Sequence, residues 1–295
     1  ETPIDNALFP EPNNTTTVIQ NLQTKPGGIV ALPLEQNFVG ASSSESGFFP
    51  PDPTGAVGPD HYVHSVNSLV KIFDKTGTLL LGPIDLSDFL GNGSNNGDPI
   101  VLYDQLADRW VVSEFGAGNN ALSIGVSETS DPTGAYNVWD FTFSSGFPDY
   151  PHYGVWHDGY YGTVNLSGAS TQGFVMERDV MLAGGASPQI LIFNLPQVVV
   201  NPNQVKSPEP VNLLGTIIDP STPGYITYIQ DDAWGGVSFD HLKVWEIEMD
   251  WVNTANSTIS IPLDIATDPF DAGELFGNGN GALFQPGTSQ RLAAH

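Results

Sequence analysis

The feature that most constrains the fold of this chain is a succession of short apolar runs separated by turn clusters, which begins near Phe48. These runs are rich in Val, Ile, Tyr, Phe and Trp, the residues that favour β-strands. No segment keeps the period of a long helix, although 84–90 and 172–182 leave room for one or two helical turns. The sequence therefore predicts an all-β protein with strands at residues 61–66, 68–73, 99–103, 109–115, 121–126 and 136–143.

A weak internal repeat indicates how the strands are grouped. Asp60, Asp108 and Asp158 each stand in a turn directly before an aromatic-led strand, 48 and 50 residues apart. A period of about 40 to 50 residues with several short strands per unit is typical of a β-propeller, in which four-stranded blades bury their faces against their neighbours. The alternative is an array of β-sandwiches with coincidental turns.

The predicted organisation is an irregular N-terminal arm over 1–45 and a β-propeller-like domain over 46–295. At the observed period this domain would hold about five or more blades. The alternatives are a complete ring and an incomplete one that a missing or separate C-terminal part continues. A second repeat, Asp-Pro-Thr-Gly-Ala, occurs at 52–56 and at 131–135 and predicts identical turns in different blades.

Charge excludes two classes of partner. The chain has 33 acidic and eight basic side chains, a formal net charge of −25, and no clustered basic patch. Such a surface repels phosphate, so we expect no nucleic-acid partner. No apolar run approaches the ~18 residues that cross a bilayer, so we expect no membrane insertion.

Other features of the chain favour export. It begins with Glu1 rather than Met, which predicts that a leader has been removed, and it has no cysteine, which excludes a small disulfide scaffold. The acidic composition, poor in Lys, suits an extracellular medium that contains calcium. We therefore expect a bacterial protein that is secreted or displayed at the cell surface.

Four long stretches carry a family resemblance: PPDPTGAVGPDHYV at 50–63, GDPIVLYDQLADRW at 97–110, DYPHYGVWHDGYY at 149–161 and QPGTSQRL at 285–292. They resemble a family of large exported bacterial proteins of uncharacterised function, of which this chain is similar to the N-terminal portion. The resemblance implies a β-propeller fold and attachment to secretion or adhesion modules. It implies no catalytic residues.

Aspartate-rich turns are the candidate metal sites. Calcium prefers carboxylate and carbonyl oxygens, which loops with Gly and Pro expose. The sequence has no EF-hand pattern, and an Asp before Pro-Thr-Gly also serves as a turn former that caps its own backbone. Calcium is the one cofactor that the sequence suggests, with the candidate ligands Asp52, Asp60, Asp131, Asp231 and Asp232.

Acids and aromatic residues suggest chemistry on glycans. A propeller glycosidase sets two carboxylates ~5 to 10 Å apart on its axis, one of them with a raised pKa. The candidate acids are Asp104, Asp149 and Asp158, and the candidate stacking residues are Trp110, Tyr150, Tyr153, Trp156 and Tyr160. With 33 acids in the chain, the alternative is that these carboxylates face solvent or fix turns.

Three functions follow from these features. The first is an extracellular binding or scaffold module for a glycan or a cell-surface protein. The second is a glycan-active hydrolase, a glycoside hydrolase with paired carboxylates on the propeller axis. The third is a structural half of a larger assembly, which a second chain would complete. The sequence contains no Cys nucleophile, no Gly-x-Ser-x-Gly motif and no P-loop.

Overall fold

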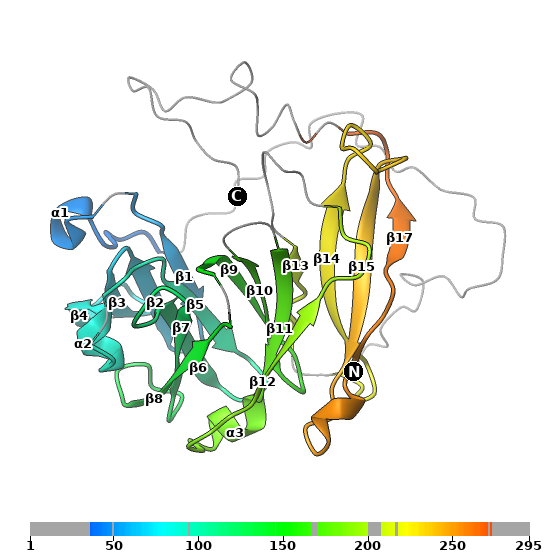
Figure 1. Cartoon of the computed structure of the whole chain (residues 1–295). Coiled ribbons are helices and arrows are strands. Elements are labelled where there is room, and N and C mark those ends of the chain that lie inside the picture. Colours follow the sequence, from blue (N-terminus) through cyan, green and yellow to red (C-terminus); the bar gives the residue numbers. More distant parts are fainter. Residues whose placement is uncertain are drawn as a thin grey trace, which may run out of the picture. The chain divides into compact units, whose positions relative to one another are not determined.

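The computed structural model describes residues 36–48, 50–93, 95–144, 146–166, 170–199, 208–215, 218–270 and 272. These residues form four antiparallel sheets that follow one another along the chain (Figure 1). Within each sheet the strands pair largely in chain order. The predicted all-β, propeller-like fold is therefore confirmed.

The first sheet consists of β1 (Thr54–Val57), β2 (His61–Val66), β3 (Leu69–Asp74) and β4 (Leu79–Asp85). The second consists of β5 (Ile100–Asp104), β6 (Arg109–Phe115), β7 (Ala121–Ser127) and β8 (Tyr136–Thr142). The third consists of β9 (Pro148–Val155), β10 (Tyr160–Leu166), β11 (Ser170–Met176) and β12 (Ile190–Asn194). The fourth consists of β13 (Glu209–Pro210), β14 (Gly224–Gln230), β15 (His241–Glu248), β16 (Thr258–Ile259) and β17 (Leu263–Ala266).

Helical structure in the described part of the chain is limited to single turns. It comprises α1 (Ser43–Ser46), α2 (Leu86–Leu90), α3 (Arg178–Leu182) and the 3-10 turn η2 (Thr254–Asn256). The helices α2 and α3 lie within the two segments where the sequence left room for a helical turn, and residues 172–176 belong to β11 instead.

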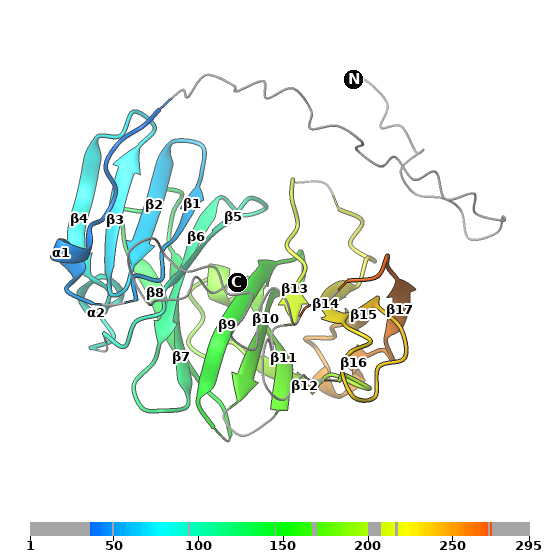
Figure 2. The same ribbon diagram turned by 90° about the horizontal axis from the view of Figure 1, so that it is seen from above.

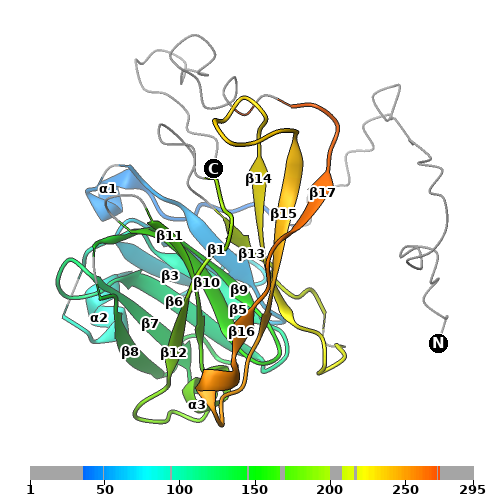
Figure 3. The same cartoon turned by 45° about the vertical axis from the view of Figure 1, so that its right-hand side comes forward.

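The first strands of the four sheets, β1, β5, β9 and β13, are the inner strands. They contact one another in that order. Figure 2 shows them grouped toward the middle of the domain, with β4 and β17 at its outer sides. In the fourth sheet, β16 and β17 both pair with β15, so two short strands share its outer edge (Figure 3).

Three hydrophobic clusters hold consecutive sheets together. Strand β6 illustrates why, because Trp110 and Val112 pack toward the first sheet and Val111 packs toward the third. Strand β10 behaves in the same way, with Tyr160 in the cluster shared with the second sheet and Tyr161 in the cluster shared with the fourth. Successive side chains of a strand point to opposite faces, so strands buried on both faces read as continuous apolar runs.

The repeat of aspartates predicted from the sequence is confirmed. Asp60, Asp108 and Asp158 occupy the turns between the first and second strands of three consecutive sheets. The second repeat does not mark identical turns. Asp52 leads into β1, whereas Asp131 accepts hydrogen bonds from the backbone N–H and hydroxyl of Thr133 in the turn between β7 and β8. Pairing with neighbouring strands overrides the identical local sequence.

The described residues contain four sheets, fewer than the sequence period predicted for the domain. The inner strands begin at Thr54, Ile100, Pro148 and Glu209, and the last interval is longer than the others, so the fourth sheet takes up more of the chain than the period predicted. Most of the predicted arm and the resembling stretch 285–292 lie outside the described residues.

The end of the predicted arm packs on the first sheet. The ring of Phe38 lies 5.0 Å from that of Phe73, and the Nζ of Lys71 lies 2.6 Å from an oxygen of Glu45. Lys71 also donates a hydrogen bond to the carbonyl of Gly40. The predicted boundary between arm and domain stays a prediction.

Candidate functional site

Three aspartates stand where the inner strands begin: Asp52 before β1, Asp98 before β5 and Asp149 at the start of β9. Because the inner strands adjoin, this arrangement brings acids from three consecutive sheets to one end of the domain, here called the acidic end. The hydroxyl of Thr54 accepts a hydrogen bond from the N–H of Val101, which links β1 to β5 at this end. The opposite end, here called the turn end, carries the repeated turns of Asp60, Asp108 and Asp158.

The backbone at the acidic end is strained. Five non-glycine residues in the described ranges have positive φ, and three of them are Asp52 at 35°, Asp98 at 49° and Tyr150 at 53°. The left-handed region is unfavourable for residues with a side chain, although Asp tolerates it better than Tyr. Such strain gathers at functional sites, where surrounding structure holds the backbone in place.

Asn67 joins two of these aspartates. Its Nδ2 donates to Oδ2 of Asp52 at 2.9 Å, and its Oδ1 accepts from the backbone N–H of Asp98 at 3.3 Å. Gly97, with φ of 85°, packs so closely on this amide that an added Cβ would overlap with its Oδ1. The side chain of Asn67 therefore sets the position of Asp98 relative to Asp52.

The carboxyl of Asp98 is the electrostatic centre of the group. Burial raises the pKa of Asp98 from 3.8 to about 6, and the negative charges of Asp52 and Asp149 add to this effect. A hydrogen bond between the carboxyls of Asp98 and Asp52 also favours the protonated form. At mildly acidic pH, Asp98 thus holds a proton that it can transfer, and the carboxylates of Asp52 and Asp149 lie near it.

A cavity of about 550 Å³ opens at the same end, lined by Asn119, Asn120, Gly146 and Phe147. The ring of Phe147 packs 4.5 Å from that of Phe115. The N–H of Phe115 in turn donates to the carbonyl of Gly97, next to Asp98. Phe147 also precedes Asp149 by two residues. The cavity thus lies at the acidic end and is lined by amide groups and an aromatic ring.

The structure does not bring the three predicted catalytic acids together. Asp149 lies at the start of β9, and Asp158 follows the end of the same strand, where its carboxylate accepts from the hydroxyl of Tyr161 at 3.1 Å. Asp104 lies at the end of β5, fully buried, in an ion pair with Arg178. Only Asp149 therefore belongs to the acidic end.

Four of the five predicted stacking residues are in the core. Trp110, Tyr153, Trp156 and Tyr160 are all at most 9% exposed, because each fills the space between two sheets. The indole of Trp110 donates to the carbonyl of Ser130, and the hydroxyl of Tyr160 donates to Asp104. Only Tyr150 is partly exposed, at the acidic end. Of the five predicted stacking residues, only Tyr150 therefore has a ring that a ligand can reach.

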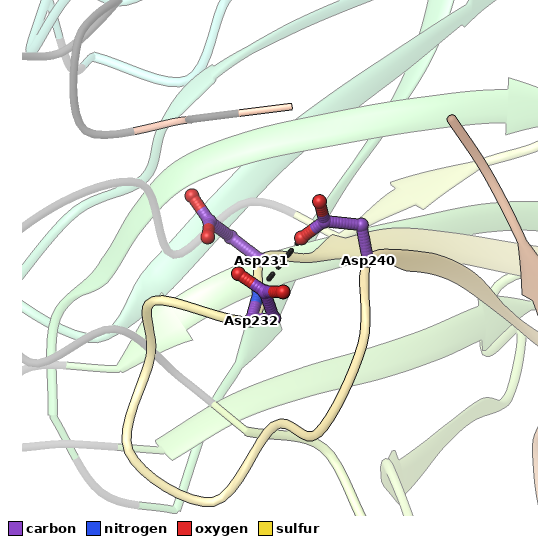
Figure 4. A group of neighbouring side chains, drawn as sticks. All are labelled: Asp231, Asp232 and Asp240. Atoms are coloured by element: carbon purple, nitrogen blue, oxygen red, sulfur yellow. Dashed lines mark hydrogen bonds between the residues drawn. The ribbon is translucent and has the colours of Figure 1, made fainter. Parts of the chain in front are cut away.

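The predicted metal ligands are likewise dispersed, except for one pair. Asp231 and Asp232 lie together in the turn after β14, and Asp240, before β15, joins them, with ligand atoms within 4.8 Å of one another (Figure 4). Asp52 belongs to the acidic end, Asp60 to an exposed turn and Asp131 to the hairpin described above.

Backbone groups already bind the two buried members of this group. Asp231 accepts from the N–H groups of Ala233 and Ala272, both at 2.7 Å. Asp240 accepts from those of Asp232 and Phe270. Oxygen donors of this kind suit a hard cation such as calcium, and the same contacts also fix the turn to the segment that follows β17.

Asp98 and Asp240 are missing from the residues predicted as sites. A signal for Asp98 is present in the sequence, since Asp52-Pro53, Asp98-Pro99 and Asp149-Tyr150-Pro151 repeat an acid ahead of a proline where an inner strand begins. Asp240 has no such signal, because its proximity to Asp231 depends on the pairing of β14 with β15.

Comparison with known proteins gives only distant structural likenesses. No family model and no curated protein matches the chain. It is similar to native Bacillus subtilis arabinanase Arb43A, with a TM-score of 0.36 and 14% identity over 73% of this chain and 81% of that chain. It is also similar to a mutant of the GH43 protein BlXynB from Bacillus licheniformis, with a TM-score of 0.38 and 12% identity over 74% of this chain and 42% of that chain.

The fold assignment stands on the four sheets and their contacts. In the described residues, no helix is long and apolar enough to cross a membrane.

Proposed function

We propose that this protein is a glycan-active hydrolase whose acids are Asp98, Asp149 and Asp52 at the acidic end. The observation that carries the proposal is the carboxyl of Asp98, whose pKa is raised to about 6 by burial and by two neighbouring aspartates. Glycoside hydrolysis needs such a pair, one carboxyl that keeps its proton and one that is ionised. This function was the alternative in the sequence analysis.

Each aspartate has a distinct part in the proposed reaction. Asp98 donates its proton to the oxygen of the leaving sugar as the glycosidic bond breaks. Asp149, which is exposed, accepts a proton from the water that attacks the anomeric carbon. Asp52 accepts a hydrogen bond from the protonated Asp98. The negative charge of Asp52 raises the pKa of Asp98, so Asp98 holds its proton until it transfers it. Asp98 then regains a proton from solvent, and Asp149 releases one.

The cavity at the acidic end supports a carbohydrate as substrate. In the lining of the cavity, Phe147 offers an apolar ring face, and the side-chain amides of Asn119 and Asn120 offer hydrogen-bonding groups. A pyranose or furanose ring has both apolar faces and hydroxyl edges, which this combination suits. We further propose that the substrate is an extracellular glycan, in keeping with the acidic, cysteine-free composition.

A binding module without catalysis is the other candidate, and the partly exposed ring of Tyr150 at the acidic end is the observation that favours it. Its ring lies 4.5 Å from that of His152 and is partly exposed. A single partly exposed aromatic side chain offers less stacking area than the five that the sequence predicted. Binding therefore takes second place.

The test is incubation of the purified chain with insoluble cell-wall polysaccharides, among them arabinan and xylan. Protein depletion and new reducing ends are measured in each tube. We expect new reducing ends with at least one polysaccharide, and a loss of about 100-fold or more in kcat for Asp98→Asn and Asp149→Asn. Asp60→Asn, an exposed acid at the turn end, is the matched control and should stay within twofold of wild type.

Two outcomes would contradict the proposal. Depletion without cleavage would favour the binding module. Cleavage that survives both substitutions would assign the reaction to other residues.

A further inference from the structure

Glu114 is a buried acid that lies close to the acidic end. It belongs to β6 and is 1% exposed. Its Oε1 accepts a hydrogen bond from Nδ2 of Asn92 at 2.9 Å, and its Oε2 accepts from the backbone N–H of Asn96 at 3.2 Å. The N–H of Gly97 donates to the same carboxylate. Two of these three donors belong to the residues that directly precede Asp98.

We propose that Glu114 is a positioning residue that holds Asp98 in place through Asn96 and Gly97, an inference that rests on the proposed function. The opposite side of Asp98 is held by Asn67, whose amide accepts from the N–H of Asp98. Asp98 is thus fixed from the first sheet by Asn67 and from the second by Glu114. Neither residue touches the reacting atoms in the proposed reaction.

Further contacts make this connection rigid. Nδ2 of Asn96 donates to the carbonyl of Gly116 at 2.8 Å, and the N–H of Phe115 donates to the carbonyl of Gly97 at 3.2 Å. The residues ahead of Asp98 are therefore bound to β6 and to the residue that follows it. Since a small misplacement of a reacting group costs much of the rate, such support belongs to a catalytic site.

The choice of an acid at this buried position requires explanation. Burial raises the pKa of Glu114 from 4.5 to about 7, and the charge of Asp140 adds to that effect, while the hydrogen bonds from Asn92, Asn96 and Gly97 oppose it. A glutamine would be cheaper to bury but presents only one acceptor oxygen to these donors. A carboxyl group has two oxygens that can accept, so Glu114 offers acceptors to all three donors.

The titratable and charged groups around Glu114 are few among the described residues. Asp140 on β8 faces it, bound by the hydroxyl of Ser123 on β7. The other partners of Glu114, Asn92, Asn96 and Gly97, carry no charge. Replacing Asp140 therefore changes the charge near Glu114 without removing any contact to the residues ahead of Asp98.

The experiment compares Glu114→Gln with Asp140→Asn. The titration midpoint of the Asp98 carboxyl is followed by carbon NMR in each variant, with Asp98→Asn used to assign the signal. We expect Glu114→Gln to lower the midpoint of Asp98 by about one pH unit, because loosened residues ahead of it admit water. In the hydrolysis assay we expect a fall in kcat of at least tenfold with KM within threefold. Asp140→Asn should leave both the titration midpoint of Asp98 and the kcat of hydrolysis near their wild-type values.

A folded Glu114→Gln protein with an unchanged Asp98 midpoint would overturn the proposal. If Glu114→Gln does not fold, Asn92→Ala removes one donor and is expected to shift the midpoint in the same direction by less; no shift would again overturn it. If wild type cleaves no glycan, the proposed function fails, but the NMR titration still decides whether Glu114 positions Asp98.

Discussion

Arg178 reaches from α3, between β11 and β12 of the third sheet, to the buried carboxylate of Asp104 at the end of β5 and binds both of its oxygens. The Nε of Arg178 lies 2.7 Å from Oδ2 of Asp104, and its Nη2 lies 3.1 Å from Oδ1. The hydroxyl of Tyr160 and the backbone N–H groups of Leu106 and Ala107 complete the shell of donors. An acid predicted to be catalytic thus ties two sheets together.

This ion pair gives the first prediction, which concerns stability. Asp104→Asn should lower the free energy of unfolding by about 3 to 5 kcal/mol, because the guanidinium of Arg178 stays buried without its charge partner. Urea denaturation followed by tryptophan fluorescence measures this. Asp179→Asn, whose exposed carboxylate lies 3.7 Å from the same guanidinium, is the control and should change stability by less than about 1 kcal/mol. Equal effects of the two substitutions would refute a special role for Asp104.

The raised pKa of Asp98 gives the second prediction, a gain in stability on removing an acid. The pKa is raised in the folded state, so the proton-linked stability is present at low pH and is lost as the pH rises from about 4 through about 6. Asp98→Asn should therefore be more stable than wild type at pH 8, by about 1 kcal/mol after allowance for solvent screening of this half-buried group.

The measurement is urea denaturation of both proteins at pH 8 and at pH 4. The advantage of Asp98→Asn should be much smaller at pH 4, because Asp98 is then protonated in the folded state and about half protonated in the unfolded state. An advantage of the same size at both pH values would show that ionisation is not its cause. The same titration predicts that hydrolysis declines as the pH rises above about 6, since the proposed acid loses its proton.

Close packing between the third and fourth sheets gives the third prediction. A methyl group at Gly224 would overlap with the ring of Tyr161 on the neighbouring sheet. Gly224→Ala should therefore lower the free energy of unfolding by about 1 to 3 kcal/mol, because a well-packed interior cannot take up the added volume. Gly235→Ala is the matched control, since nothing lies within 4 Å of its added Cβ. A neutral Gly224→Ala would mean that the two sheets separate easily.

Calcium binding by Asp231, Asp232 and Asp240 remains a proposal and gives the fourth prediction. If these residues bind calcium, millimolar calcium should raise the Tm of wild type by several degrees, and chelator should reverse the rise. Asp232→Asn should abolish the shift, while the backbone contacts of Asp231 and Asp240 stay intact. If calcium does not change the Tm of wild type, these three acids do not bind calcium, and their role is to fix the turn.

Much of the fold could be predicted, since the turns of Asp60, Asp108 and Asp158 recur at one place in consecutive sheets. The functional site was harder to predict. Trp110 and Tyr160 are aromatic residues of strands whose two faces are both covered, and strand patterns alone do not distinguish a covered face from an open one. Asp98 was overlooked although it repeats the position of Asp52 ahead of an inner strand.

Alternation of apolar residues and turn chemistry act over a few neighbouring residues, so the sequence by itself determined the strands, their turns and the repeat. The grouping of side chains into a site depends on how separate sheets pack. Asp52, Asp98 and Asp149 belong to three different sheets, and only the lateral contact of β1, β5 and β9 brings their charges together. Tertiary structure decided which acids meet because the electrostatic interaction between them depends on distance in space.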